Sequence, residues 1–253
     1  MLPRDTVGIV LHEKDYRESD RIVTFYSPDS GKTAGVAFGA RRSRKRFANC
    51  LDLFCKSRFS YVARRDSELV RLERCDLIDS YPAIRDQEKT LAYAAYLVDV
   101  VFRLTAAGDP NPALFHLLDT ALQWLNSRKP ENQVARIFEV RASSLLGYQL
   151  ELEKCTGCGK ALSGAQSAGF SAANGGIVCD RCSPTEKRRL SPGTIRALRY
   201  IQSRPLETLP RLNLTSLNVR EAGKVLRDFL IGLLHKQLRT MNYIDRLEEK
   251  ENR

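Results

Sequence analysis

Four of the seven cysteines occur in two pairs with the spacing of a metal site. Cys155 and Cys158 form one Cys-x2-Cys pair, and Cys179 and Cys182 form a second pair after a spacer of 20 residues. Two residues between cysteines allow a tight turn to aim both sulfurs at one ion, and Gly159 relaxes the first of these turns. Four thiolates brought together in this way suit tetrahedral Zn²⁺, with Zn–S distances of about 2.3 Å. We therefore expect one structural zinc ion.

The alternatives for these cysteines are four free thiols, disulfides or a redox pair. Disulfides are not expected in a protein kept in the cytosol, and neither pair has the βαβ setting of a redox Cys-x2-Cys motif. The spacer is rich in glycine, so we expect this segment to fold only with its metal. Cys50, Cys55 and Cys75 match no ligand spacing and are expected to be small core or surface thiols.

A second group of residues could bind phosphate. Residues 32–65 contain ten Lys or Arg and one acidic residue, Asp52, which is a net charge of +9. The simpler interpretation is a solvated loop, and the sharper one is a loop that neutralises the phosphates of a nucleic acid. The candidate phosphate-binding residues are Lys32, Arg41, Arg42, Arg44, Lys45, Arg46, Arg64 and Arg65.

No set of residues suggests catalysis. Residues 30–33 (SGKT) resemble the end of a nucleotide-binding loop, but Tyr26 stands where that loop needs glycine, so residues 28–31 are predicted to be a hairpin turn. Carboxylates near another turn could bind Mg²⁺, but neighbouring arginines favour ion pairing; these residues are Asp15, Glu18, Asp20, Arg17 and Arg21. We expect no enzymatic activity.

Hydrophobic periodicity divides the chain into strands and then helices. The first 80 residues alternate as about five short strands, which is typical of a small closed barrel of the OB type. Most aromatic residues there are expected in the core, and one or two could stack on bases; they are Phe25, Tyr26, Phe38, Phe47, Phe54, Phe59 and Tyr61. From residue 84 the period is helical, and Ser191-Pro192 is a typical helix start. Residues 247–253 are expected to be a frayed tail.

The fold class expected is therefore α+β multidomain, with an inserted metal module. We expect an OB-type barrel at 1–81, helices at 82–152, the four-cysteine zinc module at 153–184, and further helices with the tail at 185–253. The last segment holds 15 basic and 8 acidic residues, a net +7 within a chain total of +11. Such charge indicates an anionic partner, most often nucleic acid. No apolar run approaches the roughly 18–20 residues that cross a bilayer, and no signal peptide is apparent, so a cytosolic location is expected.

The chain resembles the bacterial RecO family of DNA repair proteins, over nearly its whole length. Residues 15–24 read DYRESDRIVT, where the usual family motif has glycine in place of Arg17. Where the family often has Lys-Ser before an aromatic residue, this chain has Arg239-Thr240-Met241. The other matching segments are GIVL at 8–11, GK at 31–32, GARRS at 39–43, NPALFHLL at 111–118, FEVR at 138–141, LGY at 146–148, GGIVC at 175–179 and SPGT at 191–194.

The resemblance implies a non-enzymatic recombination mediator that acts close to the nucleoid. It implies binding of single- and double-stranded DNA and annealing of complementary strands. It also implies partnership with RecR and with the acidic C-terminal tail of single-stranded DNA-binding protein, and indirectly with RecF and RecA. The sequence assigns no residues to those partners. The alternatives are a zinc-ribbon transcription regulator that binds duplex DNA and a metal-dependent nuclease.

Overall fold

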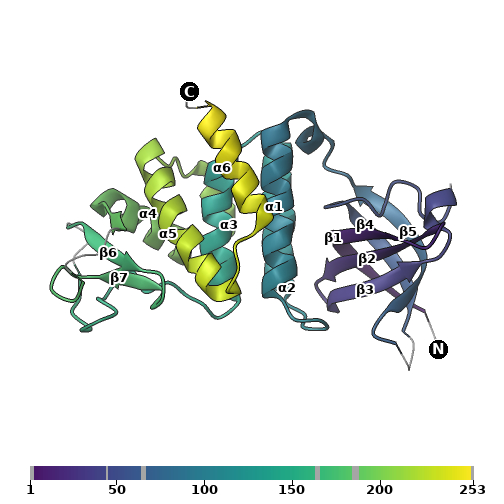
Figure 1. Cartoon of the computed structure of the whole chain (residues 1–253), viewed down its shortest axis with the longest axis horizontal. Coiled ribbons are helices and arrows are strands. Elements are labelled where there is room, and N and C mark those ends of the chain that lie inside the picture. The colour runs from purple at the N-terminus through teal and green to yellow at the C-terminus, as the bar shows by residue number, and fades with distance from the viewer. Residues whose placement is uncertain (1–2, 44, 64–66, 163–165, 184–187, 252–253) are drawn as a thin grey trace. The chain divides into compact units, whose positions relative to one another are not determined.

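The computed structural model describes residues 3–43, 45–63, 67–162, 166–183 and 188–251. The chain forms two compact units, residues 1–128 with 240–253, and residues 129–239 (Figure 1). The first unit therefore combines the barrel with helices that follow it and with the last helix of the chain. The division into four segments given above stays a prediction.

The first unit begins with a closed barrel of five strands. Neighbouring strands follow the order β1-β2-β3-β5-β4; β1 pairs with β4 in antiparallel fashion, and β3 pairs with β5 in parallel. This topology confirms the predicted OB-type barrel. Apolar side chains such as Val10, Phe25 and Leu72 fill its interior. The strands are β1 (Arg4–Tyr16), β2 (Asp20–Ser27), β3 (Gly31–Ala37), β4 (Lys56–Val62) and β5 (Val70–Asp79).

The predicted hairpin turn lies between β2 and β3. Gly31 has a φ of +63°, and a Cβ atom there would lie 2.3 Å from the Asp109 carbonyl oxygen. Only glycine tolerates both the left-handed backbone and this close approach. The segment is thus a turn that packs on the loop after the first helix, and it does not form a nucleotide-binding loop.

Helices complete the first unit. A buried polar contact joins them to the barrel, because the Lys56 ammonium lies 2.6 Å from one Asp119 oxygen while the Tyr81 hydroxyl donates to the other. The elements are η2 (Pro82–Asp86), α1 (Glu88–Leu104), α2 (Pro112–Asn126) and α6 (Arg239–Glu251).

The prediction of a frayed C-terminal tail is wrong as far as Glu251, because α6 continues to that residue. Met241 and Ile244 are 2% and 4% exposed, so one face of the helix is buried. The Tyr93 hydroxyl of α1 also donates to Glu248. These contacts come from residues about 150 positions away, which local periodicity does not reveal.

The described part of the second unit contains three α-helices, one 3-10 helix and a small antiparallel sheet of order β7-β6-β8. Ser191 caps α4 by accepting from the Thr194 N–H, which confirms the predicted helix start. Its elements are α3 (Glu131–Leu145), β6 (Ala168–Ser171), β7 (Gly176–Val178), β8 (Arg189–Leu190), α4 (Pro192–Ser203), η3 (Leu206–Arg211) and α5 (Ser216–Leu234). In the part of the chain that is described, no helix has both the length and the apolar character needed to span a membrane.

A buried arginine packs closely against one glycine of α5. Arg136 in α3 donates to Glu139 (2.7 Å), and a Cβ atom on Gly223 would lie 2.2 Å from the Arg136 Nη1 atom. We expect Gly223→Ala to lower the free energy of unfolding by about 1–3 kcal/mol, because the buried guanidinium has to move. Gly232→Ala in the same helix is the control, since nothing lies within 4 Å of its Cβ position.

For that control, helix propensity predicts a gain of up to about 1 kcal/mol. Denaturant titration of both variants measures the difference. Equal effects of the two substitutions would contradict the packing described.

Candidate nucleic-acid interface and metal centre

The densest part of the basic stretch is residues 39–46, which we call the basic run, and it follows the end of β3. It begins with Gly39, whose φ of 69° is left-handed, and continues into the short helix η1 (Ala40–Arg42). The Gly39 N–H donates to the buried carboxylate of Asp20 (2.8 Å), and the Arg41 N–H donates to the Ser19 carbonyl (3.0 Å). Both bonds hold the run against the turn between β1 and β2.

Two cations of the run have side chains engaged within the barrel. The Arg41 guanidinium donates to the Glu18 carbonyl (3.2 Å) and lies 3.6 Å from an Asp15 carboxylate oxygen. Arg46 donates to the Phe38 carbonyl (2.9 Å). Both side chains remain exposed, so they shape the loop and still present positive charge to solvent.

Two other cations of the run are exposed and not engaged in this way. Neither the Arg42 side chain nor the Lys45 side chain has a hydrogen bond or ion pair among the residues that the structure describes. They are therefore the cations most available to an external phosphate. Three further candidates lie outside the described residues: Arg44, Arg64 and Arg65.

Lys32 differs from the other candidates, because its ammonium is used inside the first unit. It donates to the Phe102 carbonyl (2.7 Å) and to the Thr105 carbonyl at the end of α1. Burial first, and the nearby Arg103 second, lower the pKa of Lys32. The structure does not bring this residue together with the basic run, so we leave it out of the proposed DNA-binding surface.

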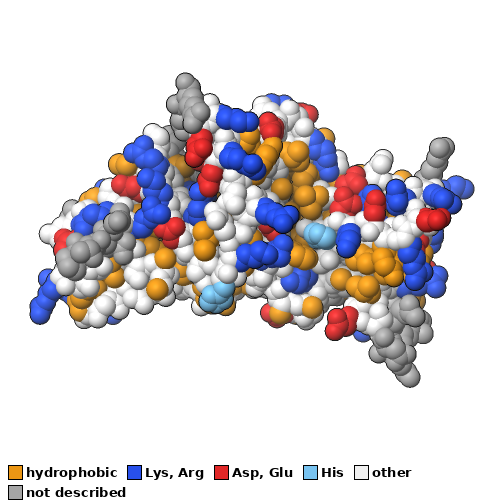
Figure 2. All heavy atoms as spheres, viewed as in Figure 1, with side chains coloured by type: hydrophobic (Ala, Val, Ile, Leu, Met, Phe, Trp, Pro, Cys, Tyr) orange, Lys and Arg blue, Asp and Glu red, His pale blue; other side chains and the backbone are white. Residues whose placement is uncertain are grey.

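Acidic residues near the run pair with arginine. The Arg21 guanidinium lies 2.8 Å from Glu13, 3.4 Å from Asp15 and 3.4 Å from Asp52. Figure 2 shows red carboxylates beside blue cations on the barrel, at the right of the view. The interpretation of Asp15 as an ion-pairing residue agrees with these contacts. Exposed pairs of this kind contribute little stability, typically about 0.2–1 kcal/mol.

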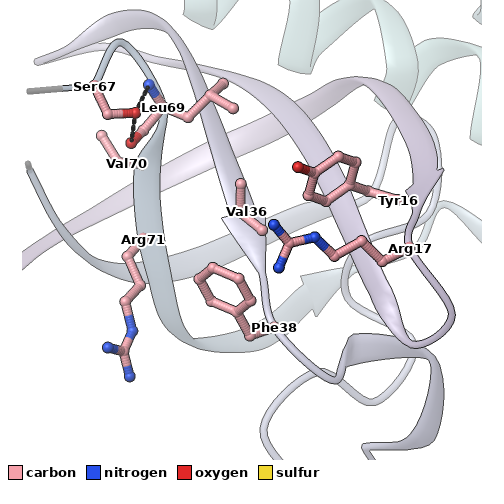
Figure 3. A pocket seen from close by; sticks show the side chains of 8 residues that line it. All are labelled: Tyr16, Arg17, Val36, Phe38, Ser67, Leu69, Val70 and Arg71. Atoms are coloured by element: carbon pink, nitrogen blue, oxygen red, sulfur yellow. Dashed lines mark hydrogen bonds between the residues drawn. The ribbon is translucent and has the colours of Figure 1, made fainter.

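Two surface pockets flank this part of the barrel. The larger, of about 390 Å³, contains the paired Arg21 and Asp52; it is lined by Arg21, Ala40, Arg41, Ser43, Phe47, Ala48, Asn49, Leu51 and Asp52. The smaller has a volume of about 190 Å³ (Figure 3). The described residues that line it include no acidic one; they are Tyr16, Arg17, Val36, Phe38, Ser67, Leu69, Val70 and Arg71.

The second unit brings the four predicted metal ligands together. The sulfurs of Cys155, Cys158, Cys179 and Cys182 all lie within 4.8 Å of one another. Cys179 Sγ is 3.6 Å from Cys155 Sγ and 3.9 Å from Cys158 Sγ. A tetrahedron of thiolates with metal–sulfur bonds of about 2.3 Å has edges of about 3.8 Å, so the cluster already has suitable dimensions.

Backbone N–H groups stabilise negative charge in this cluster. The Cys179 N–H donates to the Cys155 sulfur (3.3 Å). Burial acts to raise the pKa of Cys155, but this N–H and those of Cys158 and Gly157 outweigh it and lower that pKa to about 6. In contrast, hydrogen bonds with the Cys158 and Cys179 sulfurs raise the pKa of Cys182 to about 12. Four thiolates at this spacing therefore require a cation between them.

The turns around the cysteines match the expected geometry. Gly159 has a φ of +73° and donates to the Cys155 carbonyl (2.8 Å), while the Cys182 N–H donates to the Cys179 carbonyl (3.0 Å). The first pair is joined to β7 by a hydrogen bond from the Thr156 N–H to the Ile177 carbonyl (2.9 Å). These residues fit a soft metal ion held by four thiolates, with no coordination position left for a substrate.

The chain matches two family models along its length. A model described as "Recombination protein O N terminal" matches residues 1–81, and one described as "Recombination protein O C terminal" matches residues 85–242.

Proteins of several bacteria, all with the name "DNA repair protein RecO", are similar to this chain. The chain is 33% identical to "DNA repair protein RecO" of Syntrophus aciditrophicus (strain SB), covering 96% of this chain and 95% of that protein. It is 33% identical to the protein of that name from Pelotomaculum thermopropionicum, covering 94% and 92%. It is 38% identical to the one from Geobacter metallireducens, over 70% of this chain and 71% of that protein.

Removing an exposed sulfur tests the metal centre. We expect Cys182→Ser to lose bound metal and to lower the melting temperature, because three thiolates bind metal far more weakly than four and folding of this segment is coupled to binding. Elemental analysis and thermal unfolding measure the two effects. Cys55→Ser removes a thiol from the barrel and should keep the metal. Full metal content in Cys182→Ser would contradict the assignment.

Proposed function

We propose that this chain, which belongs to the RecO family of DNA repair proteins, acts as a recombination mediator and not as an enzyme. In this proposal it binds single- and double-stranded DNA and anneals complementary strands. With RecR it promotes loading of RecA on gaps coated with single-stranded DNA-binding protein.

One observation carries the DNA-binding part of the proposal. The basic run is hydrogen-bonded to the β1–β2 turn of an OB-type barrel. Gly39 and Arg41 tether the run to the β1–β2 turn, and Arg42 and Lys45 face solvent. OB barrels bind oligonucleotides on the face of strands 2 and 3, and the loop between strands 1 and 2 lies at the edge of that face. Lysine and arginine release counterions when they neutralise phosphates, which favours binding at low salt. Charge neutralisation on two strands also reduces their repulsion and thereby favours annealing.

The metal centre has a structural role in this proposal. Zn²⁺ is the ion that suits a closed set of four thiolates, and no redox step is needed for mediation. The ion would fasten the turn at Cys155–Cys158 to the turn at Cys179–Cys182, and it would thereby stabilise the small sheet of the second unit.

Protein partners would use charge of the opposite sign. The segment 185–253 has a net charge of +7, and α5 exposes Arg220 and Lys224. Such a surface suits the acidic tail of single-stranded DNA-binding protein. RecR is the direct partner in this proposal, with RecF and RecA acting through it, in the cytosol close to the nucleoid.

Two other functions remain less well supported. A zinc-ribbon transcription regulator would present its most basic surface beside the metal, whereas here the densest basic run lies on the barrel. A nuclease needs an open metal position or free carboxylates. The four-thiolate set is closed, and the carboxylates at Asp15 and Asp52 contact arginine.

The exposed cations of the run should contribute to the salt dependence of DNA binding. Each phosphate contact on a single strand contributes about 0.7 to the slope of log K against log salt. Arg42→Gln/Lys45→Gln should therefore weaken binding and reduce that slope by about 1.4, as measured by fluorescence anisotropy. Arg58→Gln/Arg74→Gln removes two exposed cations from β4 and β5 and serves as the control. Equal slopes for the two double variants would refute the assignment.

Mediation is tested by annealing of complementary oligonucleotides coated with single-stranded DNA-binding protein. The wild-type chain should accelerate annealing, and it should do so less when the coating protein lacks its acidic tail. Arg42→Gln/Lys45→Gln should anneal slowly with either coat, because it binds DNA weakly. An unchanged rate after removal of the tail would argue against the mediator proposal, and cleavage of the strands in the presence of metal would favour the nuclease.

A further inference from the structure

The smaller pocket on the barrel lies where the β1–β2 turn meets the end of β3 and the start of β5 (Figure 3). We propose that it takes one unstacked base of single-stranded DNA, with Arg17 and Arg71 at its edge to contact the flanking phosphates. This inference rests on the proposed function, and it names the part of the strand that the barrel recognises.

Two aromatic side chains provide stacking surfaces. Among the seven aromatic residues of the barrel singled out by sequence, six are buried and Phe38 alone is only partly buried. Tyr16, at the end of β1, is 37% exposed. Bases stack readily on exposed aromatic rings, and this interaction tolerates any base. The rings of Tyr16 and Phe38 both line this pocket, so their exposed apolar surface is available to one ligand.

The charges at this pocket differ from those at its neighbour. The Arg17 guanidinium lies 5.1 Å from the centre of the Tyr16 ring, and that of Arg71 lies 5.9 Å from the centre of the Phe38 ring. Figure 3 shows the Phe38 ring between the two arginine side chains. Arg71 also pairs with Glu73 (2.9 Å), but none of the described residues that line the pocket is acidic. An anion is therefore favoured here more than at the larger pocket.

The backbone at Arg17 gives a second, independent indication. Its φ of 54° is left-handed, a conformation that disfavours side chains and suits glycine. An arginine at this position weakens the turn slightly, and its side chain makes no hydrogen bond or ion pair with the described part of the chain. The guanidinium instead reaches into the lining of the pocket. This arrangement is explained if the Arg17 guanidinium binds an anionic ligand at the pocket.

The volume limits what can enter. Pockets for drug-sized molecules span roughly 300–1,000 Å³, and this one has about 190 Å³. The pocket has room for the ring system of one base. A base in a duplex is stacked and paired, so it is not free to enter. The pocket should therefore favour single strands over duplexes.

The test uses the full chain and three ligands at one salt concentration: a thymidine oligonucleotide, the same strand with central abasic positions, and a duplex of equal length. Phe38→Leu keeps an apolar side chain but removes the aromatic ring. It should weaken binding of the intact strand by roughly 5–150-fold, the range expected for loss of stacking on one base. It should leave binding of the abasic strand and of the duplex unchanged.

Arg17→Gly provides a variant that is expected to keep the turn, because glycine suits its left-handed backbone. It should weaken single-strand binding, reduce the salt slope by about 0.7 and leave the melting temperature at or above that of the wild type. Arg58→Gln, outside both pockets, is the matched control for loss of one exposed cation.

The outcomes separate this inference from the proposed function. If Arg42→Gln/Lys45→Gln weakens binding but Phe38→Leu binds the intact strand as tightly as the wild type, the base pocket is wrong and DNA binding by the barrel stands. If Phe38→Leu weakens binding of intact and abasic strands equally, the ring does not contact a base, and the pocket proposal is also wrong. If the wild-type chain binds none of the three ligands, both proposals fail.

Discussion

The candidate interface depends on one buried carboxylate. Asp20 is 7% exposed at the start of β2, and it accepts a hydrogen bond from the Gly39 N–H at the far end of β3. Because an unsatisfied buried carboxylate or amide costs free energy, this bond keeps the β1–β2 turn and the basic run in contact. The same contact places Arg17 beside the pocket and lets Arg42 and Lys45 face solvent. The surface that we propose for single strands thus depends on a hydrogen bond between the start of β2 and the loop after β3.

A metal ion held by the four cysteines would stabilise its segment by a different means. The strands β6, β7 and β8 have two to four residues each, which is too short for an independently stable sheet. A cation between four thiolates would hold this segment at two turns, and the backbone N–H groups aimed at Cys155 prepare a thiolate for it. The closed ligand set agrees with a chain whose function, in our proposal, lies in binding DNA and not in metal chemistry.

Local signals in the sequence predicted the barrel, the helix start at Ser191 and the four cysteines, because alternation, capping and ligand spacing involve nearby residues. Contacts between residues far apart in the sequence could not be predicted from these local signals. Lys32 belongs to a basic stretch, yet its ammonium donates to Phe102, 70 residues away. The helix α6 depends on contacts with α1, and so its end looked like a tail. The sequence also did not distinguish Phe38 from the buried aromatic residues, because exposure depends on how the barrel closes.

Hydrogen exchange of the whole chain, measured with and without a single-stranded oligonucleotide, tests the central claim most directly. If the barrel binds DNA through the face described, amides at residues 16–19, 37–43 and 69–72 should exchange more slowly with the oligonucleotide, and the effect should fade as salt is raised. Protection confined to residues 129–239, with the barrel unaffected, would contradict the account.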